Sequence, residues 1–183
     1  MKTRRSQTSR SIVMILLALG TFMAAGAHAN DAVHIDRQRS EAQKTRPAVR
    51  TPRIGKSMAV DDSFALKFAY RGAIKKLEQN ESCRALFDGL LLDGLEALKR
   101  TQYRAVQSTE ERAPCVGGVA AYTAVGASRV MICSHFHTLD RPTKAAVLIH
   151  EALHNAGLSE APVDPDAPTA AEIEEMVEEA CGF

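Results

Sequence analysis

The chain has 183 residues, 45% of them hydrophobic and 25% charged, which is enough for one folded domain with an ordinary apolar core. Four of the 23 basic residues and none of the 22 acidic residues lie in 1–29, so residues 30–183 carry a net charge of −3. This balance argues against a protein that binds nucleic acid through bulk positive charge. The absence of Trp and the aromatic content of 5% also exclude a platform for stacking bases or sugars.

Residues 1–29 have the pattern of a secretory signal peptide. A basic segment precedes an apolar run that begins at Ile12, and Ala27-His28-Ala29 provides a small-x-small cleavage pattern. The alternative is a membrane anchor, but the apolar run is shorter than the roughly 18–20 residues that span a bilayer. We therefore predict cleavage near Asn30 and a mature chain that is exported, to the periplasm or the medium, with no membrane anchor.

Residues 30–59 lack any apolar periodicity. They contain two prolines and seven basic residues against three acidic residues, a composition that buries too little surface to fold by itself. We predict a solvated, disordered tail here, with a removable pro-segment as the alternative. The folded domain is then expected to occupy residues 60–183.

All four cysteines lie in the predicted domain, and none forms a CxxC pair: Cys83, Cys115, Cys133 and Cys181. This spacing argues against a cysteine-ligated metal and against a thioredoxin-like redox site. An even number of cysteines in an exported chain favours two disulfides, for which three connectivities exist. We predict Cys83–Cys115 and Cys133–Cys181.

Two helices are expected at the start of the domain. The first begins at a cap provided by Asp61, Asp62 or Ser63 and runs to about Gln79. Its apolar residues near helical spacing are Phe64, Phe68, Ala69 and Leu77. The second is predicted over residues 82–99, with a stripe formed by Leu86, Phe87, Leu90, Leu91, Leu95 and Leu98. Both stripes are interpreted as core packing.

The second half of the domain mixes strands and helices. Residues 116–125 and 129–133 are predicted to form two strands of a hairpin. A helix then runs from Pro142, which suits a first helical turn, to Gly157, which suits a left-handed terminator. A last helix covers 169–180, where Thr169 and Glu172 form a capping box. Its solvated face is expected to carry Glu172, Glu174, Glu175, Glu178 and Glu179.

The central helix contains the motif His150-Glu151-Ala152-Leu153-His154. Residues four apart share a helical face, so the two imidazoles can converge on one Zn²⁺ at about 2.0–2.1 Å. Glu151 then lies beside the ion, where it can take a proton from an activated water and return it to a leaving amine. The alternative is a surface helix with two solvated histidines. The apolar neighbours of the motif favour a buried helix instead, in which these polar groups need a partner such as a metal.

A third ligand is expected because catalytic zinc has three protein ligands and one open position. Gly157 permits a sharp turn after the helix, and Glu160 follows three residues later. Glu160 is therefore a candidate for the third ligand, and the other candidates are Asp164, Asp166 and Glu172.

The sequence from His150 to Glu160 resembles the extended zinc signature HExxHxxGxxH of the metzincin peptidases, with Glu at the third ligand position. The segment 130–136 is similar to one that precedes the zinc helix in secreted deuterolysin-type peptidases. This resemblance implies an α+β, zincin-like domain with a zinc cofactor. It also implies a substrate peptide extended along an edge strand, for which residues 117–125 are the candidate.

Three further side chains are candidates for the site. His135 and His137 precede the zinc helix and could line a cleft, although a loop histidine is more often simply exposed. Tyr122 could present its phenol to a developing oxyanion, although a single strand tyrosine more often packs.

These patterns predict an exported zinc metallopeptidase that hydrolyses peptide bonds in protein or peptide substrates. Two other functions remain open. One is a cell-wall hydrolase that applies the same zinc chemistry to peptidoglycan, and the other is a non-catalytic exported module that binds a metal. The sequence sets neither cleavage specificity nor oligomeric state.

Overall fold

A computed structural model describes residues 51–183 of the chain. The predicted signal peptide and residues 30–50 of the predicted tail lie outside the described residues. The described part is a mixed structure of helices and a small sheet, which confirms the α+β class. The helices are α2 (Val60–Gln79), α3 (Glu81–Ala85), α4 (Gly94–Arg100), α5 (Thr109–Arg112), α6 (Arg141–Asn155) and α7 (Ala170–Cys181). The strands are β1 (Arg53–Ile54), β2 (Gln102–Ala105), β3 (Ala121–Tyr122) and β4 (Arg129–Ile132).

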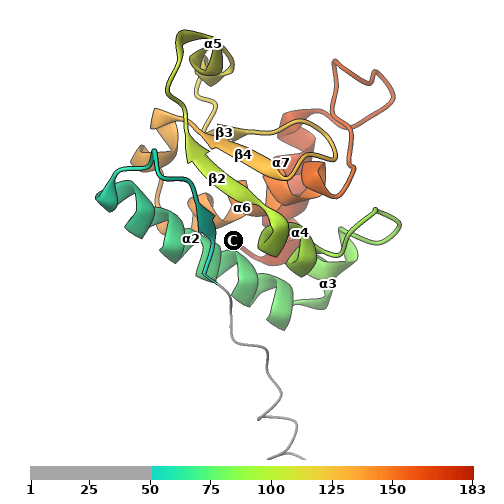
Figure 1. Ribbon diagram of the computed structural model, residues 1–183. Coiled ribbons are helices and arrows are strands. Elements are labelled where there is room, and N and C mark those ends of the chain that lie inside the picture. Colours follow the sequence, from blue (N-terminus) through green and yellow to red (C-terminus); the bar gives the residue numbers. More distant parts are fainter. Residues whose placement is uncertain (1–50) are drawn as a thin grey trace, which may run out of the picture. The chain divides into compact units, whose positions relative to one another are not determined.

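The sheet has the strand order β1-β2-β4-β3 (Figure 1). The strands β1, β2 and β4 are parallel, and β3 is antiparallel to β4. The predicted hairpin between 116–125 and 129–133 is therefore present, although its first strand has only two residues. Since β3 ends the strand order, one of its backbone edges is free of sheet partners within the described residues.

The start of the fold differs from the prediction. Residues 53–54, which were assigned to a disordered tail, form β1 and pair with residues 102–103 of β2. The strand β2 was not predicted at all. Both strands are short and carry charged residues, so neither shows the apolar alternation by which a strand is found in a sequence.

The first predicted helix is confirmed as α2, but only two of its four predicted core residues, Ala69 and Leu77, are buried. Phe64 and Phe68 are about half exposed, at 54% and 49%. The core face of α2 is formed by Leu66, Ala69, Tyr70, Ala73, Ile74 and Leu77. These residues follow the i, i+3, i+4 spacing of one helical face more closely than the predicted set does.

The second predicted helix, over 82–99, is interrupted. It is divided into α3 and α4, and the chain between them turns at Gly89 with φ +82°. Asp93 caps α4 by accepting a hydrogen bond from the Glu96 amide at 2.9 Å. Gly94 lies so close to the Phe87 ring that a β-carbon would meet it at 2.8 Å. The two glycines therefore mark a turn and a close packing contact, which a continuous helix does not provide.

The helix α6 lies at the centre of the domain and contacts α2, α4, α7 and β3. Asp140 caps its start by accepting a hydrogen bond from the Thr143 amide at 2.9 Å, and Pro142 occupies the first turn. Gly157, with φ +110°, follows its end. The predicted boundaries of this helix are thus confirmed, and so is the capping box of Thr169 and Glu172 at the start of α7.

Two disulfides join the four cysteines, as predicted, but the predicted pairing is wrong. The bonds are Cys83–Cys181 and Cys115–Cys133. The first joins α3 to the end of α7, two helices that pack together. The second joins the segment before β3 to the residue after β4, which the antiparallel pairing of these strands brings close. Cys83 and Cys115 belong to different parts of the fold.

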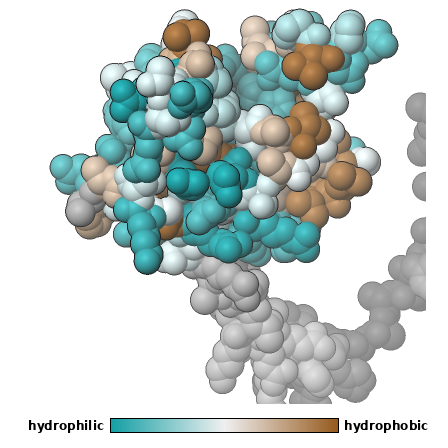
Figure 2. Space-filling model, turned by 45° about the horizontal axis from the view of Figure 1, so that its top comes forward, coloured by the Kyte–Doolittle hydropathy of each residue, from teal (hydrophilic) through white to brown (hydrophobic). Residues whose placement is uncertain are grey.

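Large apolar side chains remain exposed at several separate places on the surface. They are Phe64, Phe68, Leu91, Val116, Val125, Val163 and Met176. Figure 2 shows hydrophobic groups on one face that are separated by hydrophilic side chains. Scattered exposure of this kind is ordinary for a folded protein. Within residues 51–183, every helix is too short or too polar to cross a membrane.

Candidate metal centre

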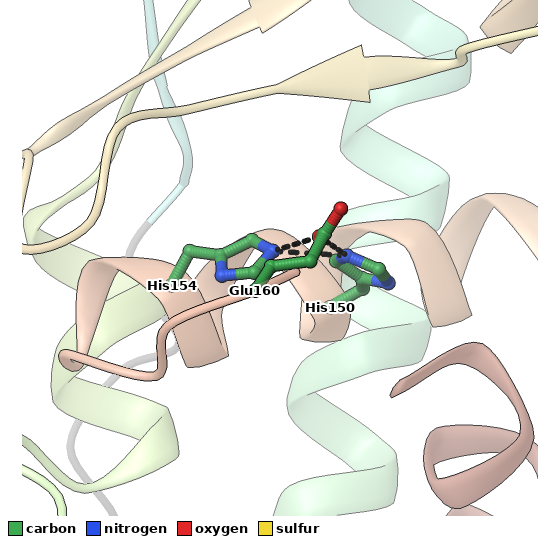
Figure 3. Close-up of side chains that lie close together, drawn as sticks. All are labelled: His150, His154 and Glu160. Carbon is green, nitrogen blue, oxygen red and sulfur yellow. Dashed lines mark hydrogen bonds and ion pairs between the residues drawn. The ribbon is translucent and has the colours of Figure 1, made fainter. Parts of the chain in front are cut away.

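Three side chains with metal-ligating atoms lie together at the end of α6: His150, His154 and Glu160 (Figure 3). Their ligand atoms all lie within 4.8 Å of one another. The two Nε2 atoms are 3.0 Å apart, and Oε2 of Glu160 lies 2.9 Å from Nε2 of His154 and 3.5 Å from Nε2 of His150. One ion could therefore contact all three side chains after small adjustments.

The helix sets the positions of the two histidines. His150 and His154 are one turn apart on α6, and their relative exposures are only 9% and 6%. The surrounding residues of α6, including Leu148, Ile149 and Leu153, are fully buried in the core. The spacing of the imidazoles thus follows from a helix that the core holds in place.

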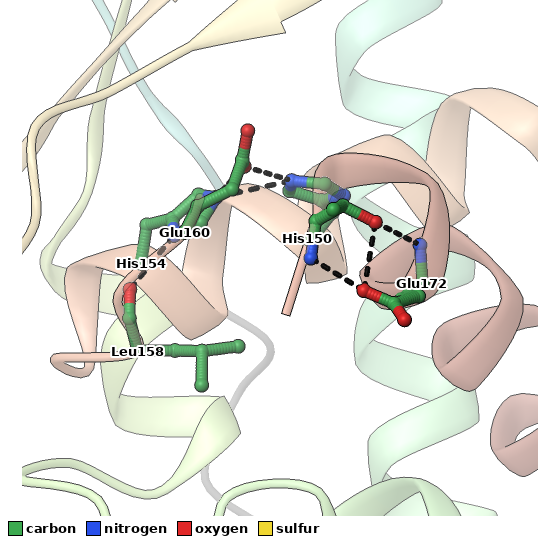
Figure 4. Close-up of polar contacts among 6 residues, drawn as sticks. His150, His154, Leu158, Glu160 and Glu172 are labelled. Carbon is green, nitrogen blue, oxygen red and sulfur yellow. Dashed lines mark hydrogen bonds and ion pairs between the residues drawn. The ribbon is translucent and has the colours of Figure 1, made fainter. Parts of the chain in front are cut away.

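A turn after α6 brings Glu160 back to the histidines. Gly157 has φ +110°, a conformation that other residues rarely adopt, and the Leu158 amide donates to the Leu153 carbonyl at 3.0 Å. The same turn orients one ring, because Nδ1 of His154 lies 2.8 Å from the Leu158 carbonyl oxygen (Figure 4). A carbonyl only accepts, so Nδ1 donates and the neutral ring keeps a lone pair on Nε2.

The donor set fits a cation. The lone pair on Nε2 of His154 faces an imidazole nitrogen and a carboxylate oxygen, so acceptors converge on one point. Burial, and next the electrostatic interaction with the neighbouring His154, lower the pKa of His150 to about 4, which leaves this imidazole neutral near pH 7. Converging acceptors in a buried place are stable when a proton or a metal ion lies between them. Two nitrogens and one carboxylate are a common ligand set for zinc.

Glu151 is a buried carboxyl group beside this cluster, with 5% relative exposure. Its Oε2 atom has no hydrogen-bond partner within residues 51–183. Burial, and in second place the charge of Glu160, raise the pKa of Glu151 to about 8. A buried carboxyl oxygen without a partner costs free energy, and such groups are more frequent at functional sites than elsewhere.

The cluster lies in a cleft with a volume of about 800 Å³. The residues of α6 that line it include His150, Glu151 and His154. The other lining segments include residues 118–125, which contain β3, residues 159–163 after the turn, and one face of α7. The cleft therefore combines a possible metal site, a buried carboxyl group and the edge strand of the sheet.

The alternative third ligands lie elsewhere. Glu172 belongs to the capping box of α7, where its carboxylate accepts from the Thr169 amide at 2.7 Å (Figure 4). Asp164 accepts from the Asp166 amide at 3.2 Å, and neither residue belongs to the cluster. Of the four acidic residues considered, the structure brings only Glu160 to the two histidines.

The remaining sequence candidates have other partners. Tyr122 lines the cleft, but its hydroxyl donates to the Glu111 carbonyl at 2.7 Å, so it is engaged with α5. His135 lines the cleft as an exposed side chain, and its Nδ1 atom lies 3.1 Å from the Thr138 hydroxyl. His137 does not line it and contacts Asp62, with 3.2 Å between Nδ1 and Oδ1.

One hydrogen-bonded group of residues next to the site was not predicted from the sequence. Asn155 is buried next to His154, and its amide donates to the Thr101 hydroxyl at 2.6 Å. Its side-chain oxygen accepts from the Thr123 hydroxyl at 2.9 Å. This bridge connects the end of α6 to the start of β2 and to the segment after β3. A polar residue directly after the second histidine was the only signal for it in the sequence.

Comparison with known proteins finds no protein-family model, no curated protein and no solved structure that matches this chain.

Proposed function

We propose that the chain is an exported zinc-dependent metallopeptidase with a zincin-like site. The observation that carries the proposal is the meeting of His150, His154 and Glu160 in a cleft that also holds the unpartnered carboxyl group of Glu151. Three protein ligands beside an open cleft support a catalytic site over a closed structural site, which takes four protein ligands. The two disulfides support export to an oxidising compartment.

In this proposal, the two imidazoles and the Glu160 carboxylate hold the ion. When bound, zinc supplies a water of lowered pKa and polarises the substrate carbonyl. The Leu158 carbonyl supports the activation of this water indirectly, since it fixes the tautomer and orientation of the His154 ring.

Glu151 carries the proton. Its carboxyl group lines the cleft next to His150 and is held in a buried position on α6. With a pKa of about 8, Glu151 exchanges a proton near neutral pH. A cation that neutralises Glu160 lowers this pKa, so that Glu151 is present as a carboxylate at neutral pH. The carboxylate then accepts a proton from the attacking water and delivers it to the leaving amine.

The substrate is proposed to be an extended polypeptide. The free backbone edge of β3 forms one wall of the cleft, so a peptide can pair with it as an added strand. In this proposal, a peptide bond of the added strand lies across α6, since Glu151 and the candidate ligands line the same cleft as β3. The edge strand lies within the segment 117–125 expected from the sequence.

The test is the activity of a Glu151→Gln variant. We expect turnover of unfolded casein to fall by about 10²–10⁴-fold, since proton transfer is lost, while the zinc content stays at the parental value. An Asp166→Asn variant, which changes an exposed acid in the following loop, is the matched control and should cleave normally. Cleavage by Glu151→Gln at the parental rate would refute the mechanism. Release of fragments from purified sacculi, without cleavage of casein, would favour the cell-wall hydrolase.

A further inference from the structure

We propose that the cleft selects polypeptide segments that carry lysine or arginine side chains, and that Glu174 and Glu178 of α7 recognise them. That the bound segment is a substrate rests on the proposed function. The selection itself concerns binding, and it follows from the charges and positions of the cleft residues.

Glu174 and Glu178 are four residues apart on α7 and both line the cleft. Both side chains are exposed, and neither forms an ion pair with any residue in 51–183. The acidic face of α7, which was expected to be solvated, therefore forms part of one wall of the cleft. Glu175 and Glu179 of the same helix do not line the cleft.

The charges that line the cleft are of one sign. Its acidic lining residues are Glu151, Glu160, Glu174 and Glu178, and no Lys or Arg lines it. The first two have tasks in the proposed site, and a divalent ion would offset their charge. The two glutamates of α7 stay uncompensated, so the wall of the cleft that they form remains negative when the metal site is filled.

A second observation, separate from the charges of α7, points to a ligand in this cleft. The carboxyl group of Glu151 is nine-tenths or more buried, lines the same cleft and has an unpartnered Oε2 atom within residues 51–183. The free edge of β3 runs along the cleft as well. A bound strand would therefore have its backbone on β3 and its side chains within reach of the α7 wall.

The α7 wall suits a long basic side chain. Ala170 is exposed and lines the cleft one helical turn before Glu174, and the exposed side chain of Val163 lines the cleft as well, so the cleft offers apolar surface besides the two carboxylates. Lysine and arginine place an aliphatic stem on such a surface and a charged head beyond it. The wall is also fixed, because Ile173 and Val177 are buried and Cys181 bonds to Cys83.

The test measures peptide binding to the zinc-loaded full chain carrying Glu151→Gln, which prevents cleavage. Three fluorescein-labelled extended decapeptides are compared by fluorescence anisotropy; they are identical except for two central residues, which are Lys, Gln or Glu. We expect the Lys peptide to bind about 5–10-fold more tightly than the Gln peptide at low salt, since exposed ion pairs contribute modestly. The Glu peptide should bind more weakly than the Gln peptide, and both differences should shrink at high salt.

Variants of α7 assign the effect to the wall. Adding Glu174→Gln and Glu178→Gln should reduce the Lys-to-Gln ratio to near one, and Glu174→Lys with Glu178→Lys should reverse the preference. The matched control, Glu175→Gln with Glu179→Gln, removes the same charge outside the cleft and should keep the ratio. Equal binding of the three peptides, absent binding of all three, or a ratio that survives Glu174→Gln with Glu178→Gln would overturn the inference.

Turnover of casein decides the proposed function separately. A chain that binds the Lys peptide selectively but never cleaves casein or sacculi would keep the charge recognition and refute the metallopeptidase. A chain that cleaves casein but binds the three peptides equally would support the metallopeptidase and refute the charge recognition.

Discussion

The candidate metal centre has a helix half and a loop half, and the two are built differently. His150 and His154 are buried on α6, so the core of the domain fixes their spacing. Glu160 lies on the segment between α6 and α7, and its side chain is 31% exposed. The helix half is thus present before any ligand binds, whereas the loop half depends on the turn at Gly157 and on how α7 is anchored.

The largest expected effect concerns the anchor of α7, which lies beyond the loop half. Replacing Cys83 and Cys181 by Ser opens a loop with a sequence separation of 98 residues, so the free energy of unfolding should fall by about 4–5 kcal/mol. Replacing Cys115 and Cys133, with a separation of 18, should lower it by about 3 kcal/mol. Urea denaturation of the oxidised proteins measures both values. A larger loss for the second pair would contradict this ranking.

The loop half itself is tested by Glu160→Gln. The variant keeps the size of the side chain but removes its charge. We expect zinc affinity to fall by about 100-fold or more, because a direct ligand contributes at least as much as the groups that hydrogen-bond to ligands. Asp164→Asn is the matched control in the same loop and should bind zinc as the parent does. Competition with a chromogenic chelator measures both. Equal affinities of the parent and Glu160→Gln would exclude Glu160 as a ligand.

A smaller effect is expected at the end of the helix half. Asn155→Ala removes the bridge between the hydroxyls of Thr101 and Thr123, each of which keeps at least one other hydrogen bond. The free energy of unfolding should fall by about 1–2 kcal/mol. Thr123→Val removes one side of the bridge and also the hydrogen bond from the Thr123 hydroxyl to the Arg129 carbonyl, so its effect should be of similar size. A change in zinc affinity without a change in stability would assign Asn155 to the site and not to the fold.

The parts of the fold that could be predicted from the sequence are those with local signals. The helix α6 has Pro142 at its start and Gly157 after its end, and α7 has the capping box of Thr169 and Glu172. Each signal acts within a few residues, so the sequence alone locates it. The same holds for the two histidines, whose spacing is one helical turn.

The predictions that were wrong concern parts of the fold that depend on partners distant in the sequence. The strand β2 exists because β1 and β4 pair with it, and its own residues carry no strand pattern. The disulfide pairing depends on the packing of α3 against α7, which no local pattern indicates. The pairing of β3 with β4, in contrast, was predicted, and it already favours the neighbouring bond between Cys115 and Cys133.

The candidate site shows the same division. Glu160 was one of four acidic residues that could follow the motif, and the turn that selects it is formed by backbone hydrogen bonds of Leu158 and the conformation of Gly157. The role of Glu174 as a cleft residue could not be predicted, because it depends on how α7 packs against α6. Sequence spacing identifies residues on one helix face, but not what that face meets.

The most direct test of the metal centre is the zinc content of purified, oxidised protein, measured by mass spectrometry alongside a His154→Ala variant. We expect about one zinc ion per chain in the parent, held by three protein ligands, and a content near background in the variant. Circular dichroism of the variant should stay close to that of the parent, because α6 is held by its apolar neighbours. A parent chain that takes up no divalent ion, even when zinc is supplied in excess, would contradict the metal centre and the function proposed from it.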